Sequence, residues 1–213
     1  IIPAGSTNII AAELGIPRNW REAVRMLFDD YQEVEVDLGR CGDRAFLHMA
    51  GAGMDSRLFA RTSARLKRHV GWLAYLAAAS RGLFDRPANI ILELDGQRLE
   101  IASSLVIVAN GGSIITPSLR LHSKPRTDDG WFDVLILTAK GPIGMARTLA
   151  RFATQSMDLS PCLLHFQARN VTMFADPALP VQLDGDVVAT TPATFSICPG
   201  GARLVVPIAG RND

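Results

Sequence analysis

The 213-residue sequence predicts an α+β fold that is mainly β, with a few helices inserted among the strands. Two observations lead to this fold class. Short apolar runs that alternate with polar residues, or stand between turn residues, recur along most of the chain and are typical of strands. Helical spacing is confined to a few segments, among them the first thirty residues. We therefore expect residues 1–30 to be the end of an α/β unit, and residues 31–213 to form a β-rich unit of about nine or ten strands.

The first thirty residues predict two short helices. Thr7 or Asn8 can cap a helix over Ile9–Leu14, and Gly15 stands where such a helix would end. A second helix fits Asn19–Phe28, because its apolar residues recur at helical spacing. The apolar face of this second helix consists of Trp20, Val24, Leu27 and Phe28.

In the next segment, the spacing of apolar residues changes from helical to a period of two. Over residues 34–38, three aliphatic side chains alternate with Glu35 and Asp37, which indicates a half-buried strand. Asp43–Met49 is the expected antiparallel partner of this strand, across a turn at Gly39–Gly42.

Beyond that strand pair, the sequence predicts a loop, two more helices and a series of strands. Gly51–Asp55 has the composition of a glycine-rich loop, and Leu66–Leu83 is apolar around most of its girth, as in a buried helix. Ile143–Thr154, after a proline, is the other helix, and Asp95-Gly96 is a hairpin turn. The strands expected here are Asn89–Leu94, Arg98–Ala102, Leu105–Ala109, Phe132–Thr138, Leu163–Ala168, Val171–Phe174, Val181–Leu183, Thr194–Cys198 and Arg203–Val206.

Composition and charge exclude several classes of protein. Apolar residues make up 48% of the chain and charged residues 20%, which is typical of a folded globular protein and not of a disordered one. The 22 Lys and Arg residues nearly balance the 21 Asp and Glu residues, whereas a dedicated nucleic-acid binder carries a basic excess. Cys41, Cys162 and Cys198 are odd in number and far apart, so we expect neither a disulfide framework nor a zinc site.

Three segments carry groups that suit the binding of anions or cations. For each of them, an ordinary structural role is the alternative interpretation. Gly5-Ser6-Thr7-Asn8 precedes a helix and suits a phosphate oxygen, or is an ordinary helix cap. Thr127-Asp128-Asp129-Gly130-Trp131 suits a hard cation, or is an Asp-Gly turn. Lys67-Arg68-His69 suits a phosphate, or is solvated charge beside a buried helix.

A fourth segment, Asp184-Gly185-Asp186, is a hairpin signal that also contains a candidate general base. Asp186 is that candidate, and nothing in the neighbouring sequence separates the catalytic role from a turn. The nucleophile motif Gly-x-Ser-x-Gly does not occur in the sequence, so no Ser-His-Asp hydrolase is indicated.

The order of the motifs along the chain is more specific than any one of them. The motifs are Ile2-Pro3-Ala4-Gly5-Ser6-Thr7-Asn8, Leu14-Gly15-Ile16-Pro17, Phe46-Leu47-His48-Met49-Ala50-Gly51-Ala52-Gly53-Met54-Asp55, Asp129-Gly130-Trp131-Phe132-Asp133-Val134 and Val181-Gln182-Leu183-Asp184-Gly185-Asp186. This series resembles the diacylglycerol kinase / sphingosine kinase family of lipid kinases, and looks closest to its soluble bacterial diacylglycerol kinase-like members. The resemblance covers essentially the whole chain.

The resemblance implies a two-domain kinase with a nucleotide cleft between the domains. The family's first domain is α/β and carries a Gly-Gly-Asp-Gly-Thr phosphate loop, whereas its second domain is β-sandwich-like. The motif Gly-Gly-Asp-Gly-Thr does not occur in this sequence. We therefore expect a β-sandwich-like C-terminal domain with inserted helices, preceded by a short helical remnant of the α/β nucleotide-binding domain. This piece by itself is expected to be inactive.

The resemblance also implies roles for residues that contact nucleotide and lipid. Thr7 and Asn8 match the family's Gly-Thr-x-Asn element, which lines the nucleotide cleft. Arg68 lies where the family has a basic residue that contacts nucleotide phosphates. Asp55 matches an aspartate near the acceptor lipid.

Metal binding and proton transfer are assigned in the same way. Asp129 matches the side-chain ligand of a structural magnesium site, with the carbonyl groups of Arg126 and Trp131 as backbone ligands. Asp186 stands where the family has the catalytic Glu of Asp-Gly-Glu, and would take the proton from the lipid hydroxyl. Because Asp is one methylene shorter than Glu, this position departs from the family pattern.

The leading hypothesis is the C-terminal part of an ATP-dependent lipid kinase, with ATP and Mg²⁺ as cofactors. The expected partners are a lipid substrate at the membrane surface and an upstream N-terminal domain, with a homodimer left open and no nucleic acid. The expected location is the cytoplasm, with peripheral contact at the inner membrane face. One alternative is a lipid-binding or regulatory module of the same fold without catalysis, and another is an NAD-kinase-like enzyme with a soluble acceptor.

Overall fold

The computed structural model describes residues 1–5, 8–29, 31–53, 87–111, 127–138, 144 and 162–208. Within these ranges the chain forms two short helices followed by strands, so the mainly β fold class is confirmed. The elements are α1 (Ile9–Glu13), α2 (Trp20–Arg25), β1 (Tyr31–Cys41), β2 (Arg44–Phe46), β3 (Met49–Gly53), β4 (Ala88–Leu94), β5 (Gln97–Ser103), β6 (Leu105–Ala109), β7 (Phe132–Leu137), β8 (Leu163–Ala168), β9 (Asn170–Asp176), β10 (Pro180–Leu183), β11 (Asp186–Thr190) and β12 (Ala193–Pro207).

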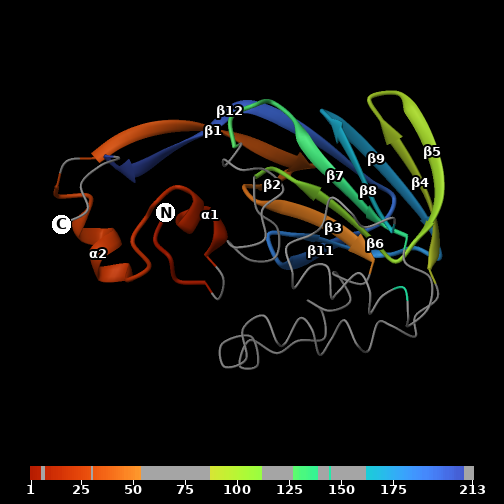
Figure 1. The fold of residues 1–213 in the computed structure, drawn as a ribbon, viewed down its shortest axis with the longest axis horizontal. Helices are drawn as coiled ribbons and strands as arrows, with labels where there is room; N and C mark the ends of the chain where they lie inside the picture. The colour runs from red at the N-terminus through yellow and green to blue at the C-terminus, as the bar shows by residue number, and fades with distance from the viewer. Residues whose placement is uncertain are drawn as a thin grey trace.

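Two antiparallel sheets of six strands make up the body of the molecule (Figure 1). The first sheet has the strand order β2-β1-β12-β9-β4-β5, and the second has the order β11-β10-β3-β6-β7-β8. In β4, buried residues alternate with less buried ones, as expected for a strand with one face in the core. In β3, β6 and β7 every residue is buried, so the middle of the second sheet is covered on both faces.

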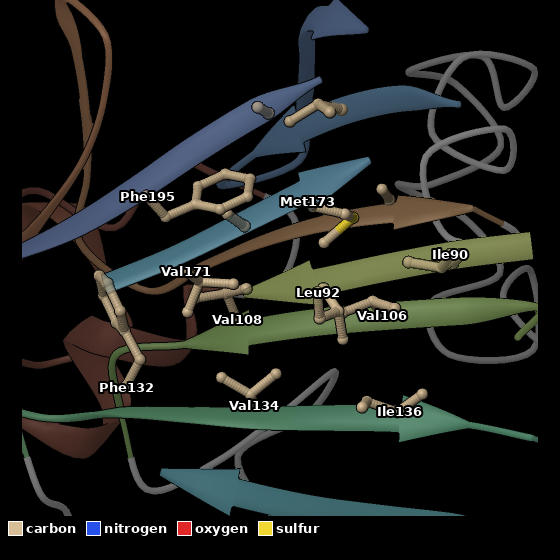
Figure 2. Packing of buried hydrophobic residues seen from close by; sticks show 14 of the residues in the cluster. Ile90, Leu92, Val106, Val108, Phe132, Val134, Ile136, Val171, Met173 and Phe195 are labelled. Atoms are coloured by element: carbon tan, nitrogen blue, oxygen red, sulfur yellow. The ribbon is translucent and has the colours of Figure 1, made fainter. Parts of the chain in front are cut away.

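The hydrophobic core lies between the two sheets. Figure 2 shows side chains of β4, β9 and β12 from the first sheet and of β6 and β7 from the second sheet directed into one layer. Phe46 links the sheets, because its ring stacks on Phe132 of the second sheet at 5.7 Å between centroids. It also meets the edge of Phe195 of the first sheet at 6.3 Å. Such aromatic pairs add to the free energy gained by burying their apolar area.

The two longest strands extend beyond the sandwich toward the helices. β1 and β12 pair along almost their whole length and reach out as a ribbon to the region of α1 and α2 (Figure 1). A small second core forms where they meet. Its buried members are Ala11, Ile16, Ala23 and Val206, with Leu14 and Val34 packed against them.

Both predicted N-terminal helices are present, but two details of the prediction are wrong. Gly15 ends α1 with a φ of 70°, as expected from its conformational freedom. Asn8 occupies the N-cap position without a side-chain cap bond. In α2 the expected apolar face is not the buried one, since Trp20 is 52% exposed and Phe28 is 86% exposed, while Ala23 is buried.

The predicted strands are largely confirmed, with three differences. The expected glycine-rich loop at Gly51–Gly53 is instead part of the central strand β3, because small residues fit where both faces of a sheet are covered. The Asp184-Gly185 turn leads into an additional strand, β11. The last two predicted strands are one long strand, β12. With β3 and β11 counted, the described residues contain twelve strands, where about nine or ten were expected.

Two expected helices lie outside the described residues. These are the buried helix Leu66–Leu83 and, apart from Gly144, the helix Ile143–Thr154. Among the described residues, no helix is long and apolar enough to cross a membrane.

The contact between Gly39 and Phe46 provides a test of core packing. A Cβ atom at Gly39 would overlap the Phe46 ring, because these residues are directly paired on β1 and β2. We expect Gly39→Ala to lower the free energy of unfolding by about 1–3 kcal/mol through overpacking. The same substitution should cost less in a Phe46→Leu background, and chemical denaturation of the four proteins measures this coupling. Equal costs in both backgrounds would contradict the packing described here.

Candidate functional site

The hairpin between β10 and β11 is fixed by polar side chains on two sides. The carboxylate of Asp184 accepts hydrogen bonds from the backbone N–H groups of three consecutive residues, Leu47, His48 and Met49, at 2.8–2.9 Å. The Asp184 N–H returns a bond of 2.8 Å to the Met49 carbonyl. Gln182, which is fully buried, accepts a 2.7 Å bond from the Gly185 N–H. The turn is therefore held against the start of β3.

This fixed turn determines the position of Asp186. Asp184 and Gly185 both have positive φ, of 48° and 97°, so the chain reverses within two residues. Asp186 is the first residue of β11 and pairs with Leu183. Its side chain is exposed, and its backbone is anchored by the turn before it. A carboxylate in this setting is accessible to a substrate and can accept a proton from it.

The loop before β7 contains the predicted metal ligands Asp129 and Trp131. The Asp129 carboxylate is half-buried and accepts a 3.1 Å bond from the Trp131 N–H, which brings this side chain to the Trp131 backbone. Gly130 between them has a φ of 75°. The guanidinium of Arg169 lies 4.4 Å from the Trp131 ring centroid and packs over the ring.

A network of hydrogen bonds connects this loop to the Asp184 turn. The Asn110 side-chain amide donates to the carbonyls of Leu47, at 3.0 Å, and Asp37, at 2.8 Å. The Asn110 N–H donates to the His48 carbonyl at 2.7 Å. Asp37 in turn accepts from the Gly130 N–H. The structure therefore places the Asp186 hairpin and the Asp129 loop along one continuous polar edge.

Sequence reasoning missed most of this network. We expected Asp37 on the polar face of a half-buried strand, but it is 2% exposed. Asn110 is equally buried, at 2% exposed. A short polar side chain directly after an apolar strand, as at Asn110, is the one signal in the sequence that could have indicated such a role.

The predicted nucleotide-binding segment is described only in part. Asn8 has a φ of 47°, and its side chain bonds to the backbone of Gly5. It accepts from the Gly5 N–H at 2.8 Å and donates to the Gly5 carbonyl at 2.9 Å, so one backbone N–H of the expected phosphate nest is engaged internally. Four other predicted site residues lie outside the described residues, namely Thr7, Asp55, Arg68 and Arg126.

An unpartnered carboxylate lies next to this segment. Both Oε atoms of Glu13, the last residue of α1, are buried, and neither has a hydrogen-bond partner among the described residues. Its Oε2 lies against Gly111, where a Cβ atom would come within 3.1 Å. A buried carboxylate without a partner is costly, so this position lowers the stability of the chain.

The donor chemistry of the Asp129 loop fits magnesium in part. A carboxylate and backbone carbonyls are the oxygen ligands that Mg²⁺ and Ca²⁺ prefer. Among the described residues, no three His, Cys, Asp or Glu side chains come together to hold a metal ion. A cation here would therefore depend on Asp129, backbone carbonyls and water.

Two stacked antiparallel sheets with a polar edge place this chain in the class of β-sandwich-like domains. The sequence model of one family matches residues 48–206, which is well over half of the chain. The chain belongs to that family, described as the YegS C-terminal NAD kinase beta sandwich-like domain.

Similar proteins have kinase names. A Pseudomonas aeruginosa protein named "Probable lipid kinase YegS-like" is 29% identical over 216 residues, which cover 97% of this chain and 67% of that protein. A Staphylococcus carnosus protein named "Diacylglycerol kinase" is 27% identical over 202 residues, covering 92% of this chain and 63% of its own length. The chain thus spans about two thirds of the length of these relatives.

A solved structure has the same fold. A candidate diacylglycerol kinase from Bacillus anthracis superposes with a TM-score of 0.80 over 98% of this chain and 68% of its own. The sequence identity of the pair is 24%, so this likeness supports the fold alone.

Asp184 provides a test of how the hairpin is held. We expect Asp184→Ala to lower the free energy of unfolding by about 1–3 kcal/mol, because three backbone N–H groups lose their acceptor. Hydrogen exchange at Leu47, His48 and Met49 should also become faster. Asp95→Ala is the matched control, since Asp95 accepts backbone N–H bonds from Arg169 and Asn170 in another hairpin. Unchanged exchange at residues 47–49 in Asp184→Ala would contradict this account.

A substitution at Glu13 is predicted to stabilise the protein, in contrast to Asp184→Ala. We expect Glu13→Met to raise the free energy of unfolding by about 1–3 kcal/mol, because it replaces a buried carboxylate by an apolar side chain of similar length. Glu22→Met, on the exposed side of α2, serves as the control and should change stability by no more than about 0.5 kcal/mol. Thermal and urea denaturation measure both effects, and a loss of stability in Glu13→Met would show that the carboxylate has a partner.

Proposed function

We propose that this chain is the C-terminal part of an ATP-dependent lipid kinase that transfers the γ-phosphate to a lipid hydroxyl, in a diacylglycerol-like or sphingoid acceptor. Its family and the names of its relatives support a kinase. The observation that carries the proposal is the exposed Asp186 at the end of a turn that Asp184 and Gln182 hold rigid. Rigid positioning of an accessible carboxylate is what general-base catalysis requires.

In the proposed reaction, Asp186 accepts the proton of the lipid hydroxyl as the hydroxyl oxygen bonds to the γ-phosphorus and the bond to the β-phosphate oxygen breaks. General-base assistance contributes about 10²- to 10⁴-fold to the rate. Asp186 is one methylene shorter than the Glu of the family motif, and a displacement of about 1 Å can cost roughly 10²-fold. The proposal therefore predicts a slow enzyme, or an acceptor that lies closer to the hairpin.

The cofactors of the proposal are ATP and Mg²⁺. Thr7, Asn8 and Arg68 would contact the nucleotide, and Asp129 would hold the metal together with the carbonyls of Arg126 and Trp131. The bound metal would supply charge neutralisation for phosphoryl transfer. In the described residues, the Asn8 side chain bonds to the Gly5 backbone, and the Asp129 carboxylate accepts a bond from the Trp131 N–H.

The remaining parts of the proposal concern acceptor and partners. Asp55 would lie near the lipid headgroup, and the substrate would be met at the surface of the cytoplasmic membrane. Residues 1–30 would belong to the α/β nucleotide-binding domain, and residues 31–213 to the β-rich domain. Since the phosphate loop is not in this sequence, we expect the 213-residue chain alone to be inactive. A homodimer is compatible with the proposal, and no nucleic-acid partner is part of it.

A second candidate function is a lipid-binding or regulatory module of the same fold. The observation in its favour is Asp186 itself, because a shortened carboxylate at the catalytic position is one way in which catalysis is lost. The two candidates differ in whether phosphate is transferred, so one assay separates them.

The test is phosphate transfer from ATP to mixed lipid micelles by the longest natural polypeptide that contains this chain. We expect transfer to one lipid class, a loss of about 10²- to 10⁴-fold in kcat for Asp186→Asn, and transfer at or above the wild-type rate for Asp186→Glu. Asp43→Asn, at the exposed turn between β1 and β2, is the matched control and should keep wild-type activity. A dinucleotide is included as a soluble acceptor, because an NAD-kinase-like enzyme would phosphorylate it in place of a lipid. Lipid binding without transfer to any acceptor would overturn the kinase and leave the module.

A further inference from the structure

Asp37 lies at an irregularity in the longest strand pair. Val36 pairs with Ala202 and Leu38 pairs with Cys198, so Asp37 on β1 faces three residues of β12, Pro199 to Gly201. The register therefore shifts at Asp37, and its side chain turns inward, where it is 2% exposed. Bulges of this kind redirect a side chain and are common beside functional sites.

The groups of Asp37 bind both ends of the Thr127–Gly130 turn. Its backbone N–H donates to the Thr127 carbonyl at 2.6 Å, and its Oδ2 accepts from the Gly130 N–H at 2.6 Å. Asp129 lies between these two contacts in the sequence. The turn that presents Asp129 is therefore held at both ends by one residue of a different strand.

The rest of the surroundings fix Asp37 in turn. Its Oδ1 accepts from the Gly200 N–H at 2.9 Å, and its carbonyl accepts from the Asn110 side chain at 2.8 Å. Gly200 has a φ of 60°, and a Cβ atom at Gly201 would lie 2.8 Å from the Leu38 Cβ atom. Glycine is therefore required at both positions of the β12 bulge, because another residue would strain the backbone at Gly200 or clash at Gly201. This requirement indicates that the bulge is a defined feature of the fold and not a chance irregularity of the strand.

We propose that Asp37 is the positioning residue of the Asp129 loop, and that it sets the affinity of this loop for a divalent cation. The inference rests on the proposed function, in which Asp129 and neighbouring carbonyls hold magnesium. Asp37 fixes the backbone around Asp129 and does not itself contact the cation. Outer-shell groups of this kind change metal affinity by roughly 10- to 100-fold when they are replaced.

The first experiment measures Mn²⁺ binding to the longest natural polypeptide by electron paramagnetic resonance, with Mg²⁺ competition, independently of any kinase assay. We expect Asp37→Asn to weaken binding roughly 10- to 100-fold, and Asp129→Asn to abolish it. Ser103→Ala is the matched control, because the buried Ser103 hydroxyl also bonds to backbone groups, those of Leu105 and Leu137, but at the opposite end of β6 and β7 from Asn110 and the Asp129 loop. It should lose stability and leave Mn²⁺ affinity unchanged.

The second measurement needs no variant, so it stands even if Asp37→Asn fails to fold. Mg²⁺ should slow hydrogen exchange of the Gly130 amide in the wild-type protein, because that amide is bonded to Asp37. Unchanged exchange at Gly130, unchanged Mn²⁺ affinity in Asp37→Asn, or no Mn²⁺ bound by the wild type would each overturn the inference. Failure of the proposed function has a different signature, since it is the absence of phosphate transfer in a wild type whose Mn²⁺ binding still depends on Asp37.

Discussion

The structure depends on one constraint, which is that backbone groups left unpaired by the strand ladders must find another hydrogen-bond partner. Three short polar side chains meet this requirement along one edge, namely Asp37, Asn110 and Asp184. Each of them bonds to backbone groups of a different strand or loop. Since an unmet buried N–H or C=O costs about 1–3 kcal/mol, these bonds determine the conformation of the loops that they hold.

The same constraint explains why the candidate site lies at this edge. The apolar layer between the sheets, with the Phe46 ring stacked on Phe132 and in edge contact with Phe195, fixes how the sheets lie relative to each other. The hydrogen bonds of the polar edge then hold the backbone beside Asp129 and Asp186 in a fixed position relative to the sheets. A carboxylate that must meet a reacting group within about 0.5 Å gains most from a rigid support of this kind.

The sequence predicts the strands well and the polar edge poorly, and the reason is physical. Period-two alternation reports which face of a strand meets the core, so β1 and β4 could be predicted. It assumes a regular ladder, however, and the bulge at Asp37 reverses the expected side of that residue. Similarly, β3 consists of small residues and Met49, and its strand character comes from neighbours on both sides. Such tertiary pairing leaves no local signal.

Three Asp-Gly pairs in this chain show why the candidate site could not be resolved from sequence alone. In Asp95-Gly96 and Asp184-Gly185 the Asp residue has a φ of 47–48°, and its carboxylate accepts N–H bonds from a neighbouring segment. Burial opposes ionisation at Asp95, but the N–H groups of Arg169 and Asn170 and the Arg169 charge outweigh it and hold the pKa of Asp95 below its ordinary value of 3.8. At Asp129-Gly130 the Asp side chain instead turns to its own loop, and the neighbouring strand supplies the acceptor, Asp37. At Asp95 and Asp184 the Asp carboxylate itself bonds the turn to another segment, whereas the bonds between the Asp129 turn and β1 are made by Asp37. In the Asp129 turn, the residue that anchors the backbone therefore differs from the residue proposed to bind the cation. This arrangement distinguishes a candidate metal ligand from the Asp of an ordinary hairpin, and it exists only in the folded chain.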